Sequence, residues 1–436
     1  MPMKNQADVL FQWSKRYGDV VYVETMGQSI VVLGSDQAAS DLLEKRSAIY
    51  SDRPRILTFE LIGWGKLLGF LPYGPEFLAT RKLFQQQLSK AQCVAYQDMQ
   101  LQQAYIFLYY LIKKPQDFRS HLTRFVATVT AEIAYGHHVS SADDAYPKMS
   151  ERVIDILIGA GIPGFNSVDM FPIQVRPEQE ELQREAFGQV QTDMASTNSL
   201  YPHREIPQYD EKHLERLSLA AYHMHGVGFE TTWSTIESFI FHVMLHPEVQ
   251  KKCHEEIDRV LGDDKLPDFK DRETLTYLEC VVQESARWHT VIPLGVPHRV
   301  MEDDIYRGML IPKGSIVISN IQSITYDENV YHSAKTFLPE RYLPKPKGYG
   351  EPFPDCNFGY GRRVCPGRYL ADASVWIAAA TLLAAFEIHP AKDKAGNDII
   401  PPLEYVNNTL TSHPKTFQCE FRLRSEKMRS LIETLK

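Results

Sequence analysis

The sequence predicts a mainly α-helical protein with a small β minority, folded as a single domain over residues 1–436. Three observations support this prediction. Apolar residues recur at spacings of three and four over most of residues 76–290, which indicates helices with one buried face. Alternating β-branched residues are confined to short segments outside that region. No internal repeat or low-complexity linker divides the chain.

Each element in the first two thirds of the chain follows from a local pattern. Residues 19–34 alternate around a glycine-containing break and predict a hairpin, and residues 36–46 predict a helix after it. The three-and-four spacing predicts further helices over 76–113, 118–136, 150–160, 178–197, 211–245, 248–262 and 275–289. His246-Pro247 is expected to end the helix over 211–245, because a residue before proline avoids helical backbone angles.

The last third is expected to alternate between strands and one buried helix. Residues 295–320 have strand and turn character, with turns at Gly308 and Gly314. An Ala-rich apolar run over 375–386 predicts a buried helix, which follows a glycine-dense loop. Strand-like segments are predicted near 385–389 and 416–423.

Composition excludes several classes of protein. A formal net charge of −8 argues against binding nucleic acid through a basic face. The six cysteines include no CxxC pair, so they are predicted to be reduced and not to form a disulfide scaffold. No stretch approaches the roughly 18–20 apolar residues that cross a bilayer, so no transmembrane segment is expected.

The loop before the Ala-rich helix reads FGYGRRVCPG over 358–367, and its cysteine has several possible roles. Cys365 could be a zinc ligand, a nucleophile or a structural thiol. Its surroundings favour a thiolate metal ligand. Gly361 and Gly367 let the backbone turn and point N–H groups at the sulfur, and the following helix N-terminus is expected to lower the thiol pKa. Arg363 can reach an anionic group of a cofactor.

This loop closely resembles the signature of the cytochrome P450 family, F-x-x-G-x-R-x-C-x-G-x-x-x-A. The residues at its fixed positions are Phe358, Gly361, Arg363, Cys365, Gly367 and Ala371. The resemblance implies a P450-type fold with a long central helix over a haem. It implies heme b with Cys365 as the axial ligand of the iron, and O2 as a co-substrate.

Two further motifs carry the same resemblance. Glu284 and Arg287 lie three residues apart on one helix face. Taken alone, such a pair is most often a surface ion pair. In the family an E-x-x-R pair joins the arginine of a downstream P-E-R motif, present here as Pro339-Glu340-Arg341. The resemblance therefore implies a structural triad of Glu284, Arg287 and Arg341.

The helix over 211–245 contains Gly228-Phe229-Glu230-Thr231-Thr232. An ordinary helix with a polar spot is the commoner interpretation of such a pentapeptide. The stretch resembles the family's A-G-x-[DE]-T-[ST], where the helix opens over the haem. Thr231 would then bind iron-bound oxygen and Glu230 would relay protons to it. Val227 departs from the pattern, which has a small residue there.

The carboxylates of haem need cationic partners. Arg81 matches the arginine of the family's W-x-x-x-R helix, with Phe77 in place of the tryptophan. His298 occupies the propionate-contacting position after the E-x-x-R helix, although a lone histidine is more often an ordinary core or surface residue. Arg363 completes the cofactor-binding set.

An apolar cavity is expected on the distal side of the haem. Its proposed lining is Val227, Ile292, Leu294, Val296 and Leu410, together with Ile62, Trp64 and Leu67. Each of these is more often plain core than a substrate contact. Together they predict an apolar small organic substrate, either a secondary metabolite or a xenobiotic.

The resemblance is strongest to fungal microsomal members, and we expect this chain to lack their N-terminal membrane anchor and Pro-rich hinge. The stretch over 160–212 is shorter than expected. The family implies electrons from an NADPH-dependent cytochrome P450 reductase, docked near Arg362, Arg368 and the helix of Arg81-Lys82. It also implies the cytosolic face of the endoplasmic reticulum membrane, with peripheral membrane contact.

The predicted function is therefore that of a haem-thiolate monooxygenase. Two alternatives stay open. One is an O2-independent haem-thiolate isomerase or dehydratase, which the Glu230-Thr231 pair disfavours. The other is a truncated form that binds haem but turns over poorly, because a shortened roof would admit water.

Overall fold

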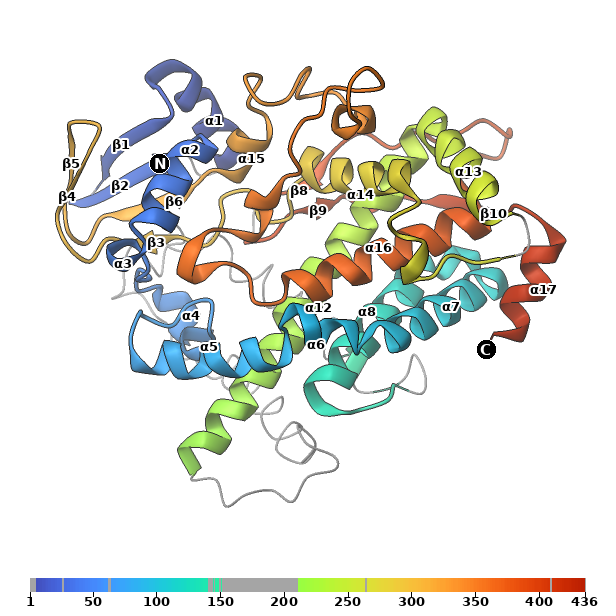
Figure 1. Ribbon diagram of the computed structural model, residues 1–436, viewed down its shortest axis with the longest axis horizontal. Coiled ribbons are helices and arrows are strands. Elements are labelled where there is room, and N and C mark those ends of the chain that lie inside the picture. Colours follow the sequence, from blue (N-terminus) through green and yellow to red (C-terminus); the bar gives the residue numbers. More distant parts are fainter. Residues whose placement is uncertain are drawn as a thin grey trace.

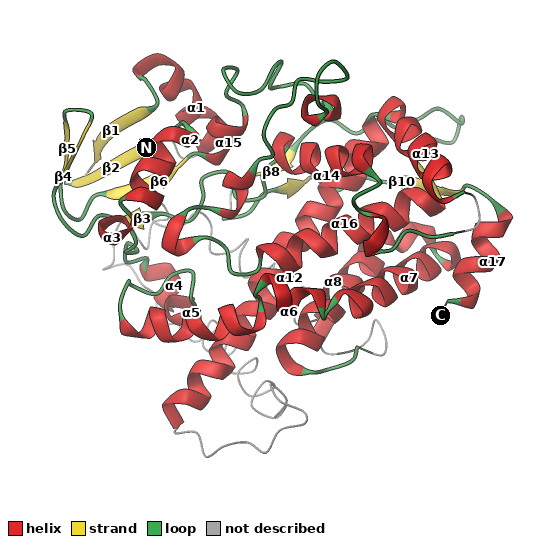
Figure 2. Ribbon diagram, viewed as in Figure 1, coloured by secondary structure: helices red, strands yellow, loops and turns green. Residues whose placement is uncertain are grey.

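The computed structural model describes residues 5–25, 27–61, 64–139, 144, 146–148, 150, 211–262, 265–407 and 410–435. Helices make up most of this part of the chain, and the strands of the largest sheet gather at one side (Figure 2). The fold is mainly α with a minority of strands, as the sequence predicts. Apart from Ser150, the predicted helices over 150–160 and 178–197 lie outside the described residues, as does the segment 160–210.

The α-helices are α1 (Gln6–Tyr17), α2 (Asp36–Ala39), α3 (Ser47–Tyr50), α4 (Leu57–Leu61), α5 (Pro75–Gln87), α6 (Lys90–Val94), α7 (Gln97–Lys113), α8 (Phe118–Tyr135), α12 (Glu211–Leu245), α13 (Pro247–Leu261), α14 (Thr276–Trp288), α15 (Ile321–Thr325), α16 (Arg368–Ala385) and α17 (Glu426–Thr434). The strands are β1 (Val20–Thr25), β2 (Gln28–Leu33), β3 (His298–Arg299), β4 (Asp304–Tyr306), β5 (Met309–Ile311), β6 (Ile316–Ser319), β7 (Phe386–Pro390), β8 (Tyr405–Val406), β9 (His413–Pro414) and β10 (Cys419–Leu423).

Helix α12 is the long central element, and it crosses the middle of the molecule in green (Figure 1). Its bounds agree with the predicted helix over 211–245, which ends before Pro247 for the reason given above. It packs against α8, α14 and α16. Nearly every residue of α16 from Ala373 onward is buried, because its Ala-rich surface allows close approach of α7 and α12.

The largest sheet has the order β1-β2-β6-β3 and lies away from this helical core (Figure 1). β1 and β2 form the predicted antiparallel hairpin, with Val20 opposite Leu33 and Thr25 opposite Gln28. β6 then pairs parallel to β2, so that a segment almost 290 residues later in the chain completes the sheet. β7 and β10 pair near the C-terminus, as the strand-like segments predicted.

Two predicted helices differ from the structure. The predicted helix over 76–113 consists of α5, α6 and α7, because the side chain of Ser89 caps a new helix by accepting from the N–H of Gln92 at 3.2 Å. The predicted helix over 36–46 is the short α2 followed by a π-helical turn, Ser40–Lys45. None of the helices in the described residues is long and apolar enough to span a membrane.

Candidate functional site

The loop that enters α16 is fixed around Cys365. The backbone N–H of Cys365 donates to the carbonyl of Phe358 at 2.8 Å. Gly361 has a φ of 54°, and a Cβ there would lie 2.3 Å from the carbonyl oxygen of Leu43. Glycine is required at this position, because any other residue would combine left-handed strain with a backbone clash. This contact holds the loop against the π-helical turn Ser40–Lys45.

Four groups near the Cys365 thiol favour its negatively charged form. Backbone amides of Gly367 and Arg368 hydrogen bond to the sulfur, and the guanidinium groups of Arg81 and Arg368 lie near it, so each of these lowers its pKa. Burial has the largest effect and raises the pKa of Cys365 above its ordinary value. The predicted lowering of the pKa by the helix N-terminus is present in the two amides, but in the protein alone desolvation outweighs the amides and the cations. A metal cation at the sulfur would reverse the balance.

The two glycines of the loop have different backbone roles. Gly367 lies in the predicted turn before α16, but its φ of −87° is one that any residue can adopt, so this turn does not depend on glycine. A Cβ on Gly367 would lie 3.9 Å from Sγ of Cys365, at ordinary contact distance. Its contribution to the site is the amide N–H that it presents to the sulfur.

A cluster of buried cations lies beside this loop. Arg363 donates to the carbonyls of Ser51 at 2.7 Å and Leu71 at 2.8 Å, and its guanidinium carbon lies 3.7 Å from the ring centroid of Phe77. Burial lowers the pKa of Arg363 to about 10. Arg81 lies on α5, as does Phe77. Its side chain is 9% exposed and makes no hydrogen bond or ion pair with any described residue.

His298 joins the cluster from β3 as a neutral group. Its Nδ1 lies 2.7 Å from the carbonyl oxygen of Tyr50, which identifies Nδ1 as the protonated nitrogen. Burial, followed by the charges of Arg53 and Arg363, holds the pKa of His298 well below its usual range. Nε2 therefore accepts hydrogen bonds in the protein as it stands, and it can donate to a carboxylate only if a nearby anion raises that pKa.

These cations provide a test of whether haem fits the site. A buried charge without a counter-ion is strongly unfavourable. Arg81 has no acidic partner among the described residues. Arg363 hydrogen bonds to backbone carbonyls and has Asp52 as an acid at longer range, so a ligand with carboxylates would supply anions to both arginines. Cys365 is not fully covered by protein atoms. The residues present therefore fit a cofactor that offers a metal to Cys365 and carboxylates to the arginines.

Arg53 is a member of this cluster that the sequence did not indicate. Its Nη1 donates to the carbonyls of Val296 at 2.6 Å and Pro297 at 2.8 Å, and its Nε donates to Gly69 at 2.9 Å. It thus holds the backbone next to His298. Nothing in the local pattern of the segment 50–54 distinguishes a buried arginine from a solvated one.

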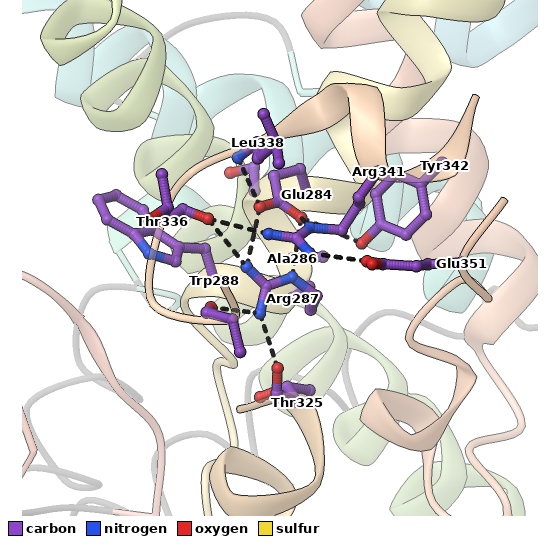
Figure 3. Close-up of polar contacts among 12 residues, drawn as sticks. Glu284, Ala286, Arg287, Trp288, Thr325, Thr336, Leu338, Arg341, Tyr342 and Glu351 are labelled. Carbon is purple, nitrogen blue, oxygen red and sulfur yellow. Dashed lines mark hydrogen bonds and ion pairs between the residues drawn. The ribbon is translucent and has the colours of Figure 1, made fainter. Parts of the chain in front are cut away.

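The predicted triad forms in the interior and not at the surface (Figure 3). Nε of Arg287 and Nε of Arg341 both donate to Oε2 of Glu284, at 2.8 and 2.9 Å. The N–H of Leu338 and the hydroxyl of Tyr342 also donate to this carboxylate. All three charged side chains of the triad are fully buried, so the surface interpretation of the Glu284–Arg287 pair is excluded.

The triad is connected to the Cys365 loop through its backbone surroundings. Arg287 donates to the carbonyls of Thr325 at 2.6 Å and Ala334 at 2.8 Å. Nδ2 of Asn357, one residue before the loop, donates to the carbonyl of Ala286 at 2.9 Å. The bond of Asn357 ties the segment before the loop to α14, which carries Glu284 and Arg287.

Glu230 and Thr231 are consecutive residues of α12, so their side chains lie on different faces of this unbroken helix. The hydroxyl of Thr231 donates to the carbonyl of Val227 at 2.9 Å, and α12 is continuous through this region. The opening expected from the family resemblance is therefore not present in this helix. Gly228 has Cγ2 of Thr130 as its nearest neighbour, at 3.7 Å, so it allows α8 to approach closely.

Glu230 is a buried acid, 2% exposed. Its Oε1 accepts from the hydroxyl of Ser234 at 3.2 Å, and Thr411 also hydrogen bonds to the carboxyl group. Burial raises the pKa of Glu230 to about 7, and the two hydroxyls oppose that shift. A carboxyl group with such a pKa can hold or release a proton near neutral pH.

The proposed pocket residues are only partly brought together. Val227, Ile292, Leu294, Val296 and Leu410 are each partly exposed. Leu294 packs against the core of the largest sheet, and Leu410 packs against the main helical core. Trp64 and Leu67 are fully buried, and Ile62 lies outside the described residues.

The zinc alternative for Cys365 receives no support. No group of three or more His, Cys, Asp or Glu side chains in the described part of the chain is arranged to hold a metal ion. Cys356, the only nearby cysteine in sequence, is buried, and burial raises the pKa of its thiol to about 12. Such a thiol is a poor metal ligand at neutral pH.

Known proteins similar to this chain cover almost all of it. The model of the Cytochrome P450 family matches residues 2–205 and 190–421. The chain is 35% identical to cytochrome P450 monooxygenase COX2 of Coprinopsis cinerea, over 99% of this chain and 88% of that protein. It is 34% identical to cytochrome P450 monooxygenase 176 of Postia placenta, over 99% of this chain and 89% of that protein. It is 33% identical to cytochrome P450 monooxygenase claT of Ampulloclitocybe clavipes, over 99% of this chain and 90% of that protein. Together with the cysteine loop and the buried Glu-Arg-Arg triad, these matches establish that the chain belongs to the cytochrome P450 family of monooxygenases.

Proposed function

We propose that this chain binds heme b through Cys365 and inserts one oxygen atom of O2 into an apolar small organic molecule. The observation that carries the proposal is the uncompensated guanidinium of Arg81 close to a cysteine whose sulfur accepts two backbone amides. Haem would place its iron at the Cys365 thiolate and a carboxylate at the Arg81 guanidinium, so it would account for both features. When bound, haem supplies the activation of O2.

The chain's own residues would bind the cofactor, orient oxygen and supply protons. Arg81 and Arg363 would hold the cofactor's carboxylates, and those anions would raise the pKa of His298 enough for its Nε2 to donate as well. The amides of Gly367 and Arg368 would stabilise negative charge on Cys365. On the opposite side, the hydroxyl of Thr231 would orient oxygen, with Glu230 as the proton donor.

An apolar substrate is supported by the partly exposed side chains near α12. We propose that Val227, Ile292, Val296 and Leu410 contact it, with Leu294 as a less direct contributor because it packs on the sheet core. Such a lining would exclude water from the reacting groups. A fungal secondary metabolite or a xenobiotic has this chemistry.

Members of this family draw electrons from a redox partner, and we propose an NADPH-dependent cytochrome P450 reductase. Arg362 and Lys82 are exposed and suited to contact it, whereas Arg81 is buried and is therefore removed from the docking surface predicted earlier. Location on the cytosolic face of the endoplasmic reticulum membrane, with peripheral contact, is part of the same proposal.

The proposal is tested by the carbon-monoxide difference spectrum of the reduced protein. We expect a Soret band at the thiolate position for the wild type and for Cys356→Ala, which removes a neighbouring buried cysteine. Cys365→Ala should lose this band. A thiolate band that survives Cys365→Ala would contradict the assignment of the ligand.

Product formation then separates the remaining functions. With reductase, NADPH and a panel of apolar compounds, a monooxygenase incorporates one ¹⁸O atom from ¹⁸O2 into its product. An isomerase or dehydratase would form product without O2. A truncated, poorly active form would show the thiolate band but consume NADPH without product.

A further inference from the structure

A second buried acid lies two turns beyond Glu230 on α12. Glu230, Ser234 and Glu237 are spaced by four and three residues, so they share one face of the helix. Glu237 has a side-chain exposure of 0%. Helix α12 packs against β9, whose His413 lies close to Glu237 (Figure 1). The monooxygenase mechanism proposed above does not use Glu237.

Glu237 is paired imperfectly. Nη2 of Arg119, on α8, lies 2.5 Å from its Oε1, and Nδ1 of His413 lies 4.0 Å from its Oε2. Arg119 thus holds Oε1 by an ion pair and hydrogen bond, whereas Oε2 has no hydrogen-bond partner among the described residues. Glu284 provides a contrast, because its carboxylate accepts five hydrogen bonds. A purely structural acid is expected to be satisfied in that way, since unpaired buried oxygens cost free energy.

Several buried polar atoms around the two acids lack a hydrogen-bond partner among the described residues. They are Oε2 of Glu230, Nε1 of Trp233, Oε2 of Glu237 and Nε2 of His413. The rings of Trp233 and His413 are 5.9 Å apart. Seven residues of helix span about 10 Å, a distance that two or three water molecules bridge. Buried water typically satisfies such groups in proteins.

One end of this group of residues reaches the surface. The side chain of Arg119 is 29% exposed and that of His413 is 16% exposed, whereas Glu237 is not exposed at all. Nη1 of Arg119 also donates to the hydroxyl of Thr416 at 3.1 Å, which holds the guanidinium in place. We call Arg119, His413, Glu237, Ser234 and Glu230 the polar track.

We propose that Glu237 is a positioning residue for proton supply, and that the polar track carries protons through bridging waters from the surface at Arg119 and His413 to Glu230. This inference rests on the proposed monooxygenase function. Glu230 releases its proton toward the hydroxyl of Thr231. The Glu230 carboxylate is reprotonated through water from the Glu237 carboxyl group. The Glu237 carboxylate, paired with Arg119, regains a proton from bulk water, so no net charge accumulates.

The acid–base properties of the two carboxyl groups are matched for this transfer. Burial raises the pKa of Glu237 to about 8, and the charge of Arg119 opposes the shift. The corresponding value for Glu230 is about 7. The other titratable groups that face Glu237 are His413, whose pKa is lowered by burial, and Cys419, whose pKa burial raises to about 12. Both acids thus hold a proton near neutral pH and can exchange it.

The test is hydrogen–deuterium exchange at the Glu230 carboxyl group, followed by infrared spectroscopy of the complete haem-loaded chain. The carbonyl stretch of protonated Glu230 is identified by its loss in Glu230→Gln. After transfer into D2O, we expect this band to shift about a hundredfold more slowly in Glu237→Gln than in the wild type, the lower end of what a positioned proton-transfer group contributes. Glu237→Asp keeps a protonatable group and should exchange faster than Glu237→Gln.

A second pair of variants leaves the charges unchanged. Ser234→Ala interrupts the polar track and should slow the exchange. Ser238→Ala is the matched control, because Ser238 is equally buried on α12 but hydrogen bonds to His289 outside the track. Equal exchange rates in the wild type, Glu237→Gln and Ser234→Ala would overturn the proposal. So would equal rates in Glu237→Gln and Glu237→Asp.

Activity supplies an independent readout. In Glu237→Gln, Glu230 should be reprotonated more slowly. With reductase and NADPH, a larger fraction of the NADPH consumed should then yield hydrogen peroxide. Failure of the proposed function would appear as a wild type without the thiolate carbon-monoxide band. Failure of the polar track would leave that band intact while the exchange rates stay unchanged, so the two outcomes are distinguishable.

Discussion

Arg287 forms a two-point ion pair with Glu284, in which both N–O distances are 2.8 Å and both side chains are fully buried. Two parallel hydrogen bonds of this kind depend on the planar fork of the guanidinium group. The same arginine donates to the carbonyls of Thr325 and Ala334. Its geometry therefore organises the backbone behind the Cys365 loop as well as the pair itself.

Replacing Arg287 with lysine is expected to destabilise the protein by about 3 to 5 kcal/mol, because a single ammonium cannot satisfy Glu284 and the carbonyls together. The free energy of unfolding from urea titration measures the effect. Arg55→Lys is the matched control, since Arg55 makes the same two-point contact with Glu60 in an exposed position, 73% and 39% exposed. It should cost less than about 1 kcal/mol. Equal costs in the two variants would contradict the structural role of burial.

Gly361→Ala is expected to disrupt the Cys365 loop. The added Cβ would lie 2.3 Å from the carbonyl of Leu43 at a φ of 54°, so the loop must move off the π-helical turn. We expect a loss of about 3 kcal/mol or more together with reduced haem content. Gly359→Ala separates the steric clash from the strain of a positive φ. Gly359 also has a positive φ, of 74°, but has open space around its Cβ position. It should cost only about 1 kcal/mol, and a comparable loss in both variants would exclude the clash as the cause.

Arg81→Met is expected to change stability in opposite directions with and without cofactor. In the haem-free protein the variant should be more stable, because it removes a buried cation for which the described residues provide no acidic partner. In the haem-loaded protein it should lose haem faster, because a carboxylate loses its guanidinium. Urea titration of both forms and transfer of haem to an acceptor protein measure the two effects. A variant that is less stable in both forms would contradict the assignment of Arg81 as a cofactor ligand.

Glu230 should make stability fall as pH rises. Its pKa is about 7 in the folded protein against an ordinary 4.5, so above pH 4.5 the folded state retains a proton that the unfolded state loses. This contribution is present below pH 4.5 and is lost as pH rises through 7. Its full size is about 3 kcal/mol. Glu230→Gln should therefore lose about 3 kcal/mol less stability than the wild type between pH 4.5 and 8, measured by urea titration. Parallel pH profiles would show that Glu230 is not buried in its protonated form.

Local patterns predicted much of the fold and the residue types of the site. Helix α12 has its predicted bounds because its periodicity and the following proline are both encoded within a few residues. The motifs identified Cys365, the triad and Arg81 because each consists of residue types at fixed spacing. The local pattern did not predict Ser89 as a helix cap. Its side chain caps the N–H of Gln92, which needs a side-chain acceptor only because a new helix begins there.

The sequence by itself determined the fold class and the family, because periodicity and motif spacing are short-range properties of the chain. Only the tertiary structure decided which charges are buried and what they face. It placed Glu284 in the interior, brought Arg53 to the cation cluster and brought Arg119 and His413 to Glu237. It also raised the pKa of Cys365, where the helix terminus alone would lower it. Burial and partners come from segments far apart in sequence, and desolvation depends on all of them together.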